Sequence, residues 1–183
     1  MRAKLIRCAS TVLKAIFFDL HGTLAYVPKP LGEEEISRFL LDRGLRVYPQ
    51  SWRAAHNYVS MIDYPKNGYR NWQQFLRQVL YRLDTRVEDA TLKELVRLFE
   101  GHPFKLYRDA KPAIVEAKRF NLRTAIITTI AKFKFEQPIQ PLTRKIGLLV
   151  DGYVARCEKS TPQMLRVALN KLGLRPQEAV MIG

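Results

Sequence analysis

Cysteine is scarce in this sequence, acidic residues are few, and long apolar runs are missing. The two cysteines, Cys8 and Cys157, stand far apart, with neither a Cys-x-x-Cys spacing nor a histidine cluster beside them. This pattern argues against a disulfide framework and against a zinc site built on cysteine. We therefore expect a reducing, cytoplasmic setting.

The apolar runs are too short for a membrane protein. The most apolar one, Ala15 to Leu20, falls well below the roughly 18 residues that a transmembrane helix needs. The first residues are basic, as in an export signal, but Lys14 interrupts the apolar stretch that such a signal requires. We expect neither a membrane span nor an export signal.

Asp and Glu number 17 against 31 Lys and Arg, which leaves a formal net charge of +14. A surface of this charge attracts anions such as phosphorylated metabolites, nucleic acid or acidic membranes. The chain has 183 residues, of which 47% are apolar, enough for one domain or one domain with an insertion. A disordered tail, a repeat array or a collagen-like rod is excluded.

The clearest local pattern lies near the N-terminus. The apolar run from Ala15 is followed by Asp19-Leu20-His21-Gly22-Thr23, which indicates a buried strand with a carboxylate at its C-terminal end. Open α/β sheets place their chemistry at that end of their strands. The next residues, 25–32, contain two prolines and predict a connector.

Residues 33–101 have the apolar spacing of four amphipathic helices with no strand pattern between them. The second helix is predicted to bury Trp52, Ala55, Val59 and Ile62. Aromatic residues at helical spacing, including Trp72, Phe75 and Phe99, predict the core of a small bundle. The predicted helix ends are Gly44 after the first helix, a Ser51 cap for the second, Asn71 before the third, and a Thr91-x-x-Glu94 capping box and Gly101 for the fourth.

After Gly101 the pattern alternates between helix and strand, which predicts an α/β fold with a parallel sheet. The predicted elements are a helix over 110–120, a strand over 123–129, a helix over 141–146, a strand over 148–150, a helix from Thr161-Pro162 to Gly173 and a strand over 179–183.

Three residues in this order suit phosphoryl chemistry. The carboxylate of Asp19 can attack phosphorus and form an aspartyl-phosphate. Thr128, at a strand end, and Lys159, just before a helix, can bind phosphoryl oxygens through a hydroxyl and an ammonium group.

The segment from Phe17 to Leu24, FFDLHGTL, resembles the first motif of the haloacid dehalogenase-like superfamily, usually written DxDxT. The strand ending in Thr128 resembles the second motif, and Lys159-Ser160-Thr161-Pro162 resembles the family's lysine motif. Residues 179–183 are similar to the strand before the fourth motif. The resemblance implies a Rossmann-like core of residues 1–28 and 102–183, with a helical cap of residues 29–101 inserted after the first motif.

The resemblance also implies a mechanism, because most members of the superfamily are phosphatases. Asp19 would be the nucleophile and a ligand of Mg²⁺, and the main-chain carbonyl of His21 would be a second ligand. Thr128 and Lys159 would hold the phosphoryl group of a small phosphorylated substrate. An oxygen-donor set of this kind suits Mg²⁺.

Two departures from the family pattern bear on this mechanism. His21 stands where family phosphatases have the aspartate that protonates the leaving group and activates water, and imidazole can do acid and base work near neutral pH. The sequence ends at Gly183, just before the fourth motif would add acidic metal ligands. We expect the chain to be a fragment of a longer protein.

The expected function is thus a magnesium-dependent phosphohydrolase, with two alternatives. One is carbon–halogen cleavage, which uses the same nucleophile without metal, and the other is a degenerate, non-catalytic basic binding module.

The alternation Lys132-Phe133-Lys134-Phe135 suits either base stacking or, as we expect, a half-buried segment. His56 and His102 are expected at the surface or in caps. The identity of the substrate and the oligomeric state stay open.

Overall fold

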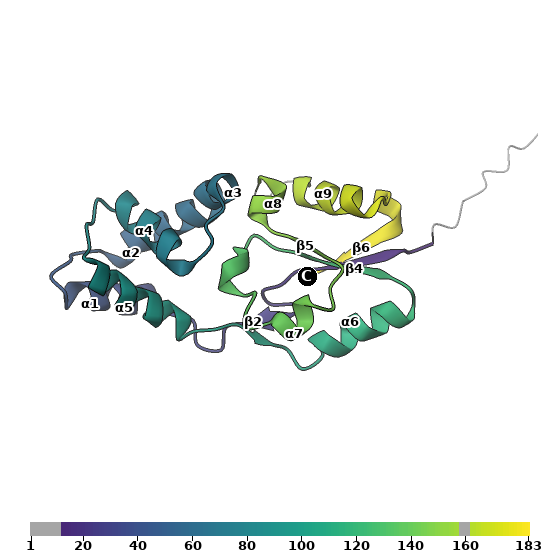
Figure 1. The fold of residues 1–183 in the computed structure, drawn as a ribbon, viewed down its shortest axis with the longest axis horizontal. Coiled ribbons are helices and arrows are strands. Elements are labelled where there is room, and N and C mark those ends of the chain that lie inside the picture. Colours follow the sequence, from purple (N-terminus) through teal and green to yellow (C-terminus); the bar gives the residue numbers. More distant parts are fainter. Residues whose placement is uncertain (1–11, 158–161) are drawn as a thin grey trace, which may run out of the picture.

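The computed structural model describes residues 12–157 and 162–183. One lobe of these residues contains a four-stranded sheet with helices on both faces, and the other is a bundle of helices (Figure 1). Two short strands, β2 (Ala25–Tyr26) and β3 (Lys105–Leu106), pair antiparallel where the chain leaves the first lobe and where it returns. The α/β fold with a parallel sheet, predicted from the sequence, is confirmed.

All four strands of the main sheet run parallel, in the order β5-β4-β1-β6. Strand β1 is therefore internal, and its last residue, Phe18, is in register with Ile126 on β4 and Ile182 on β6. Because the strands are parallel, their carboxyl ends meet at one edge of the sheet. The strands are β1 (Ala15–Phe18), β4 (Arg123–Ile127), β5 (Leu148–Val150) and β6 (Ala179–Ile182).

The two central strands, β1 and β4, are buried on both faces along most of their length, which explains why they are largely apolar, whereas Val180 and Ile182 on the edge strand β6 are exposed. Side chains of consecutive residues alternate between the faces, so Phe17 packs in one apolar cluster and Phe18 in the other. Burying each phenylalanine contributes about 1.5–3 kcal/mol. The covering helices are α6 (Ala110–Arg119) and α7 (Gln140–Thr143) on one face, and α8 (Gly152–Ala155) and α9 (Gln163–Leu172) on the other (Figure 1). Two 3₁₀ turns complete this lobe, Lys132–Lys134 and Pro176–Glu178.

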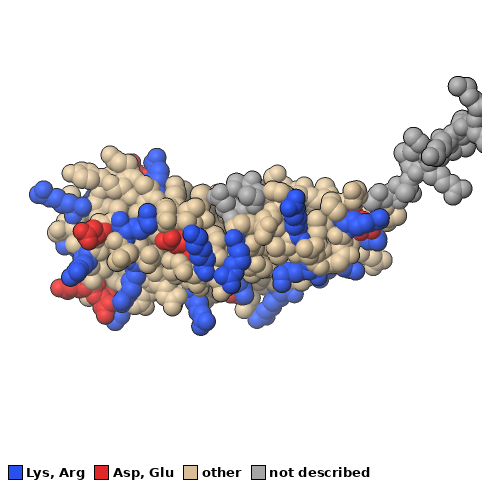
Figure 2. Space-filling model, turned by 90° about the horizontal axis from the view of Figure 1, so that it is seen from above, with Lys and Arg blue, Asp and Glu red and all other residues tan. Residues whose placement is uncertain are grey.

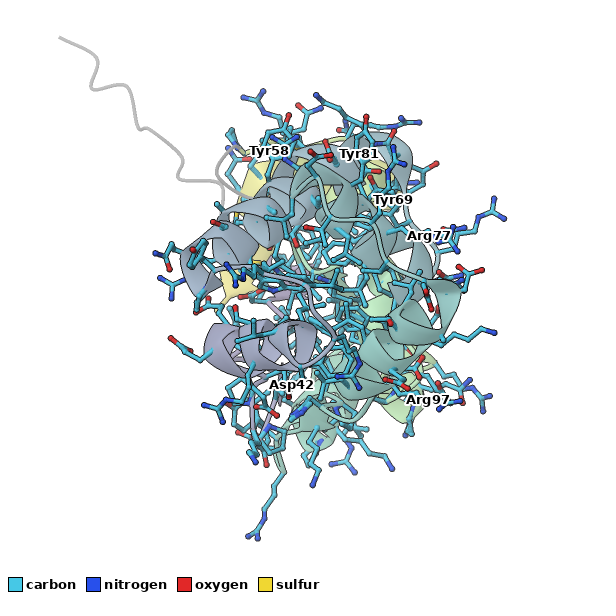
Figure 3. All side chains as sticks on the ribbon, turned by 90° about the vertical axis from the view of Figure 1, so that its left-hand side faces the viewer. Asp42, Tyr58, Tyr69, Arg77, Tyr81 and Arg97 are labelled. Atoms are coloured by element: carbon cyan, nitrogen blue, oxygen red, sulfur yellow. The ribbon has the colours of Figure 1, made fainter. Side chains whose placement is uncertain are left out.

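The helical lobe, which we call the cap, has an apolar core of its own. Its elements are α1 (Glu33–Leu41), α2 (Pro49–Tyr58), a π-helical turn (Val59–Asp63), α3 (Tyr64–Asn67), α4 (Trp72–Arg82) and α5 (Asp89–Glu100). Trp52, Phe75 and Phe99 are buried in this core as predicted, whereas Trp72 is only half-buried. Figure 3 views the cap from its far end, where the side chains of Arg77 and Arg97 point outward.

Two of the predicted helix caps are wrong. Helix α2 begins at Pro49 rather than after Ser51, because proline at the first helical position needs no hydrogen-bond partner for its nitrogen. Helix α5 begins at Asp89, so Thr91 lies inside it, and the Glu94 carboxylate accepts hydrogen bonds from Arg43 instead of closing a capping box. The Asn71 cap is confirmed, since its side chain accepts the backbone N–H of Gln74 at 2.9 Å.

The π-helical turn after α2 overturns a burial prediction. Val59 is fully buried, but Ile62, predicted on the same face, is 38% exposed. A π turn places one more residue in each turn than an α-helix does, so residues three apart no longer share one face. The next buried side chain is that of Tyr64, which leaves the bundle and meets the sheet lobe.

The surface is basic over both lobes. On the face seen in Figure 2, Lys and Arg side chains are scattered across the cap and the sheet lobe and do not form a single stripe. Within residues 12–157 and 162–183, none of the helices is long and apolar enough to cross a membrane.

One buried carboxylate links the residues that precede the neighbouring strands β1 and β6. Glu178, just before β6, accepts from Lys14 Nζ at 2.7 Å and from the Arg175 backbone N–H at 2.8 Å. These donors lower the pKa of Glu178 from 4.5 to about 2, with the bond from Lys14 as the largest cause. The ionised carboxylate therefore stabilises the folded state.

We predict that Glu178→Gln lowers the free energy of unfolding at pH 7. Because the folded pKa is depressed, the contribution of the carboxylate is complete above pH 4.5 and is lost as the pH falls toward 2. Urea unfolding of wild type and variant at pH 7, 5, 4 and 3 checks this; the difference should be similar at pH 7 and 5 and should shrink at pH 4 and again at pH 3. Glu116→Gln, which removes a pair on the exposed surface, is the control and should change little. An equal loss at pH 3 and pH 7 would contradict the prediction.

Candidate active site

Asp19 directly follows the internal strand β1 and lies at the carboxyl edge of the sheet. Its backbone N–H donates to the carbonyl of Ile182 on β6 at 2.8 Å, and its side chain is half-buried. A Cβ atom at Gly183 would lie only 2.5 Å from Asp19 Cβ. The backbone at Gly183 thus lies so close to Asp19 that any larger residue there would require one of the two segments to move.

A tight turn carries the chain away from Asp19. The backbone N–H groups of Thr23, Leu24 and Ala25 all donate to the carbonyl of Leu20. Gly22 donates to Ala25 and has a φ of +84°, a conformation that glycine adopts without strain. None of these four bonds uses the carbonyl oxygen of His21, which leaves this oxygen available as a ligand.

Thr128 follows β4, the strand next to β1, and is buried with 1% exposure. Its backbone N–H donates to the Val150 carbonyl at 3.0 Å, and its hydroxyl oxygen accepts the N–H of Ile130 at 3.2 Å. The hydroxyl can therefore still donate its own proton. The parallel register brings Thr128 to the same sheet edge as Asp19, whereas the third predicted residue, Lys159, lies outside the described residues.

A cavity of about 550 Å³ opens between the cap and the sheet lobe, and His21 is part of its wall. The His21 side chain is exposed and packs edge-on against Phe104, with ring centroids 5.9 Å apart. Thr129 lines the same cavity, although the sequence drew attention only to its neighbour Thr128. Asp19 and Thr128 are not among the lining residues of this cavity, whereas His21 and Thr129, which follow them in the sequence, are.

His56 also lines this cavity, which corrects its predicted place at the surface or in a helix cap. Its side chain is half-buried in the cap, edge-on to Phe75 at 5.2 Å. Burial, and then the nearby charge of Lys134, lower the pKa of His56 to about 3. His56 is therefore a neutral imidazole at physiological pH.

Asp151, at the end of β5, is a third polar residue at the carboxyl edge, and sequence reasoning assigned it no role. It is 2% exposed; its Oδ1 caps α8 by accepting the Val154 N–H at 2.9 Å, and its Oδ2 accepts the Lys132 N–H at 3.3 Å. The Tyr64 hydroxyl also donates to Oδ2. The signal was in the sequence, since an apolar run followed by Asp and Gly resembles the pattern around Asp19.

The Tyr64–Asp151 hydrogen bond joins the cap to the sheet lobe. Burial raises the pKa of Tyr64 above its ordinary value, and the bond to Asp151 raises it further, so the hydroxyl keeps its proton and donates it. The surrounding contact between α3 and α8 depends on a glycine. A side chain at Gly68, whose φ is +66°, would collide with the Tyr153 ring.

The residues around Asp19 suit Mg²⁺ in chemistry. In the described part of the chain, no three His, Cys, Asp or Glu side chains gather closely enough to hold a metal ion. Mg²⁺ usually takes one or two carboxylates and completes its shell with substrate and water oxygens. The Asp19 carboxylate and the His21 carbonyl are oxygen donors of the required kind, and they fit such a partly open site.

This arrangement agrees with a comparison of the sequence with known families. The model of the haloacid dehalogenase-like hydrolases matches residues 13–183, nearly the whole chain. The chain belongs to this family. The resemblance inferred from the first motif is therefore confirmed. A search of curated proteins finds no match.

Solved structures of the family share this fold at low sequence identity. An L-2-haloacid dehalogenase from Xanthobacter autotrophicus, with chloropropionic acid covalently bound, is 18% identical with a TM-score of 0.55; the match covers 93% of this chain and 69% of that one. A phosphatase of the family from Thermococcus onnurineus is 18% identical with a TM-score of 0.58, covering 93% and 77%. Similarity at this level supports the haloacid dehalogenase-like fold and does not separate the two activities.

We predict that Tyr64→Phe destabilises the protein and loosens the cap. The substitution leaves the buried Asp151 carboxylate without one of its three donors, at a cost of about 1–3 kcal/mol. Urea unfolding measures this loss, and limited proteolysis of the segments between the lobes measures the loosening. Tyr153→Phe keeps a ring on Gly68 and is the matched control. Equal stability of the two variants would show that the Tyr64 bond does not hold the lobes together.

Proposed function

We propose that this hydrolase is a magnesium-dependent phosphohydrolase that acts on a small phosphorylated metabolite through an aspartyl-phosphate. The observation that carries the proposal is the position of Asp19 at the carboxyl end of the internal strand. Thr128 ends the adjacent strand, and the cavity beside His21 is large enough for a metabolite.

The proposed reaction has two steps. In the first, an Asp19 carboxylate oxygen forms a bond to phosphorus while the bond from phosphorus to the leaving-group oxygen breaks, and that oxygen takes up a proton. In the second, water attacks the aspartyl-phosphate, which releases phosphate and restores the carboxylate. The imidazole of His21, exposed at the cavity wall, is the group we propose for both proton transfers.

The other proposed residues bind and position the substrate. The Thr128 hydroxyl accepts the Ile130 N–H and still has its own proton, which we propose it donates to a phosphoryl oxygen. We propose Lys159 as the second phosphoryl-binding residue on the sequence motif alone. The Asp19 carboxylate and the His21 carbonyl would hold Mg²⁺, which when bound supplies the positive charge that offsets repulsion between carboxylate and phosphate.

We predict that Asp19→Asn lowers phosphate release from 4-nitrophenyl phosphate in the presence of Mg²⁺ by a factor on the order of 10³ or more, since the covalent route is lost. Initial rates with and without Mg²⁺ measure the effect. Asp42→Asn, at an exposed position after α1, is the matched control and should retain the wild-type rate. Equal rates for wild type and Asp19→Asn would refute the covalent mechanism.

Carbon–halogen cleavage is the second candidate, and the surroundings of His21 favour it. The His21 ring packs on Phe104 at the edge of a cavity whose wall also includes Val27, Met61 and Ile130. In this reaction Asp19 would attack the carbon of a 2-haloacid, the carbon–halogen bond would break, halide would leave, and water would hydrolyse the ester. No metal takes part.

The two candidates differ in their response to a chelator. For the phosphohydrolase, we predict that EDTA abolishes phosphate release and that added Mg²⁺ restores it. Phosphate release from 4-nitrophenyl phosphate and chloride release from 2-chloropropionate, each measured with and without EDTA, decide between them. Chloride release that EDTA leaves unchanged, without any release of phosphate, would replace our proposal with the second candidate.

A further inference from the structure

The cavity beside His21 contains no acidic side chain. Thirteen described residues line it, and its titratable groups are His21, His56 and Lys134. The remainder are apolar, aromatic or neutral polar side chains, with Trp72 and Phe104 as the largest. A chamber of this kind suits a ligand that has an apolar body and a negative charge.

Lys134 is the source of positive charge in this chamber. Its Nζ lies 3.8 Å from the ring centroid of Phe75 and 5.0 Å from that of Trp72, so aromatic faces surround it. No described carboxylate forms an ion pair with Lys134, whereas Lys132 in the same turn pairs with Glu136 at 3.0 Å. Aromatic faces offset only part of the cost of removing an ammonium group from water.

The pKa of Lys134 agrees with this geometry. Burial lowers the pKa of Lys134 from its ordinary value to about 7, so the ammonium group loses its proton more readily than that of an exposed lysine. Neutral His56 faces Lys134 from α2 and supplies no counter-charge. On the opposite side, Glu100, His102 and Lys105 line an adjoining cavity of about 810 Å³ that Lys134 also borders. An anion bound at Lys134 should therefore draw a proton onto it.

An independent observation comes from the cap side of the chamber. The hydroxyl oxygen of Ser60 is buried and has no hydrogen-bond partner among the described residues. Ser60 lies in the π-helical turn and lines the same cavity as Lys134. A buried hydroxyl without a partner costs about 1–3 kcal/mol, and π turns are frequent at functional sites. This turn of the cap therefore carries an unsatisfied polar atom next to the chamber wall.

We propose that this chamber binds the leaving group of the substrate, and that it selects phosphate monoesters whose leaving group is an apolar, ring-sized body with its own carboxylate, held by Lys134. This inference rests on the proposed phosphohydrolase function and extends it to a substrate class. Lys134 acts here as a specificity-determining residue that contacts the leaving group.

The test compares phenyl phosphate with 4-carboxyphenyl phosphate, which differ only in the carboxylate. We expect wild type to favour the carboxylated ester in kcat/KM by about 10- to 100-fold, the effect of one charge-assisted hydrogen bond in a desolvated site. Lys134→Met should remove this preference, because phenyl phosphate has no carboxylate for Lys134 to hold and the two esters then meet the same chamber. Lys132→Met, which changes a lysine already paired with Glu136, should keep the preference.

Two results would overturn the inference. One is a wild-type enzyme that does not distinguish the two esters, and the other is a Lys134→Met variant that loses activity on both equally while keeping its fold. Thermal unfolding checks the fold, and the variant should be no less stable than wild type, because methionine replaces a half-buried ammonium group without an ion-pair partner by an apolar chain of similar length.

A binding experiment separates this inference from the proposed function. Calorimetric titration of 4-carboxyphenyl phosphate at pH 7 with EDTA present, in two buffers of different ionisation enthalpy, measures affinity and proton uptake without hydrolysis. We expect measurable proton uptake in wild type and none in Lys134→Met, because the pKa of Lys134 is lowered. Binding with this uptake but no phosphate release would support the chamber and refute the phosphohydrolase. Absence of binding would refute the chamber.

Discussion

Parallel pairing of β1 between β4 and β6 is the constraint on which the rest of this structure depends. Because all strands point the same way, residues from distant parts of the sequence leave the sheet at one edge: Asp19, Thr128, Asp151 and Gly183. The strands stay in register because both faces are apolar, and a slip of one residue would turn Phe17 and Phe18 to the wrong sides. The apolar packing of the sheet thus holds the proposed nucleophile in place.

A second level of organisation joins the cap to this edge. The cap has its own apolar core and meets the sheet lobe where Tyr64 donates to Asp151. The same carboxylate accepts the backbone N–H of Lys132, the first residue of the turn that contains Lys134. One buried carboxylate therefore contacts the cap, the β5 edge and the turn that lines the chamber. We propose that the cap, the nucleophile and the specificity-determining lysine are held in one geometry for this reason.

Local sequence patterns were sufficient for the four strands of the main sheet and for most of the helices, but not for the two-residue strands β2 and β3, the first of which lies in the predicted connector. An apolar run that ends at an Asp-containing turn can form little other than a buried strand, and Asn71 has a side chain that caps a helix wherever one follows. Patterns failed where a neighbour in space competed with them. Glu94 pairs with Arg43 from another helix, and the π-helical turn changes the face on which Ile62 lies.

The sequence by itself determined that the chain has an α/β fold and belongs to the haloacid dehalogenase-like hydrolases, because the strand pattern and the motif around Asp19 consist of contiguous residues. Only the tertiary structure decided the surroundings of His56, Lys134 and Asp151. Lys132 and Lys134 are alike in the sequence, yet one pairs with Glu136 at the surface and the other lies among aromatic rings. The difference arises because the desolvation of a charge depends on what packs around it, and those neighbours come from helices 60 residues or so away in the chain.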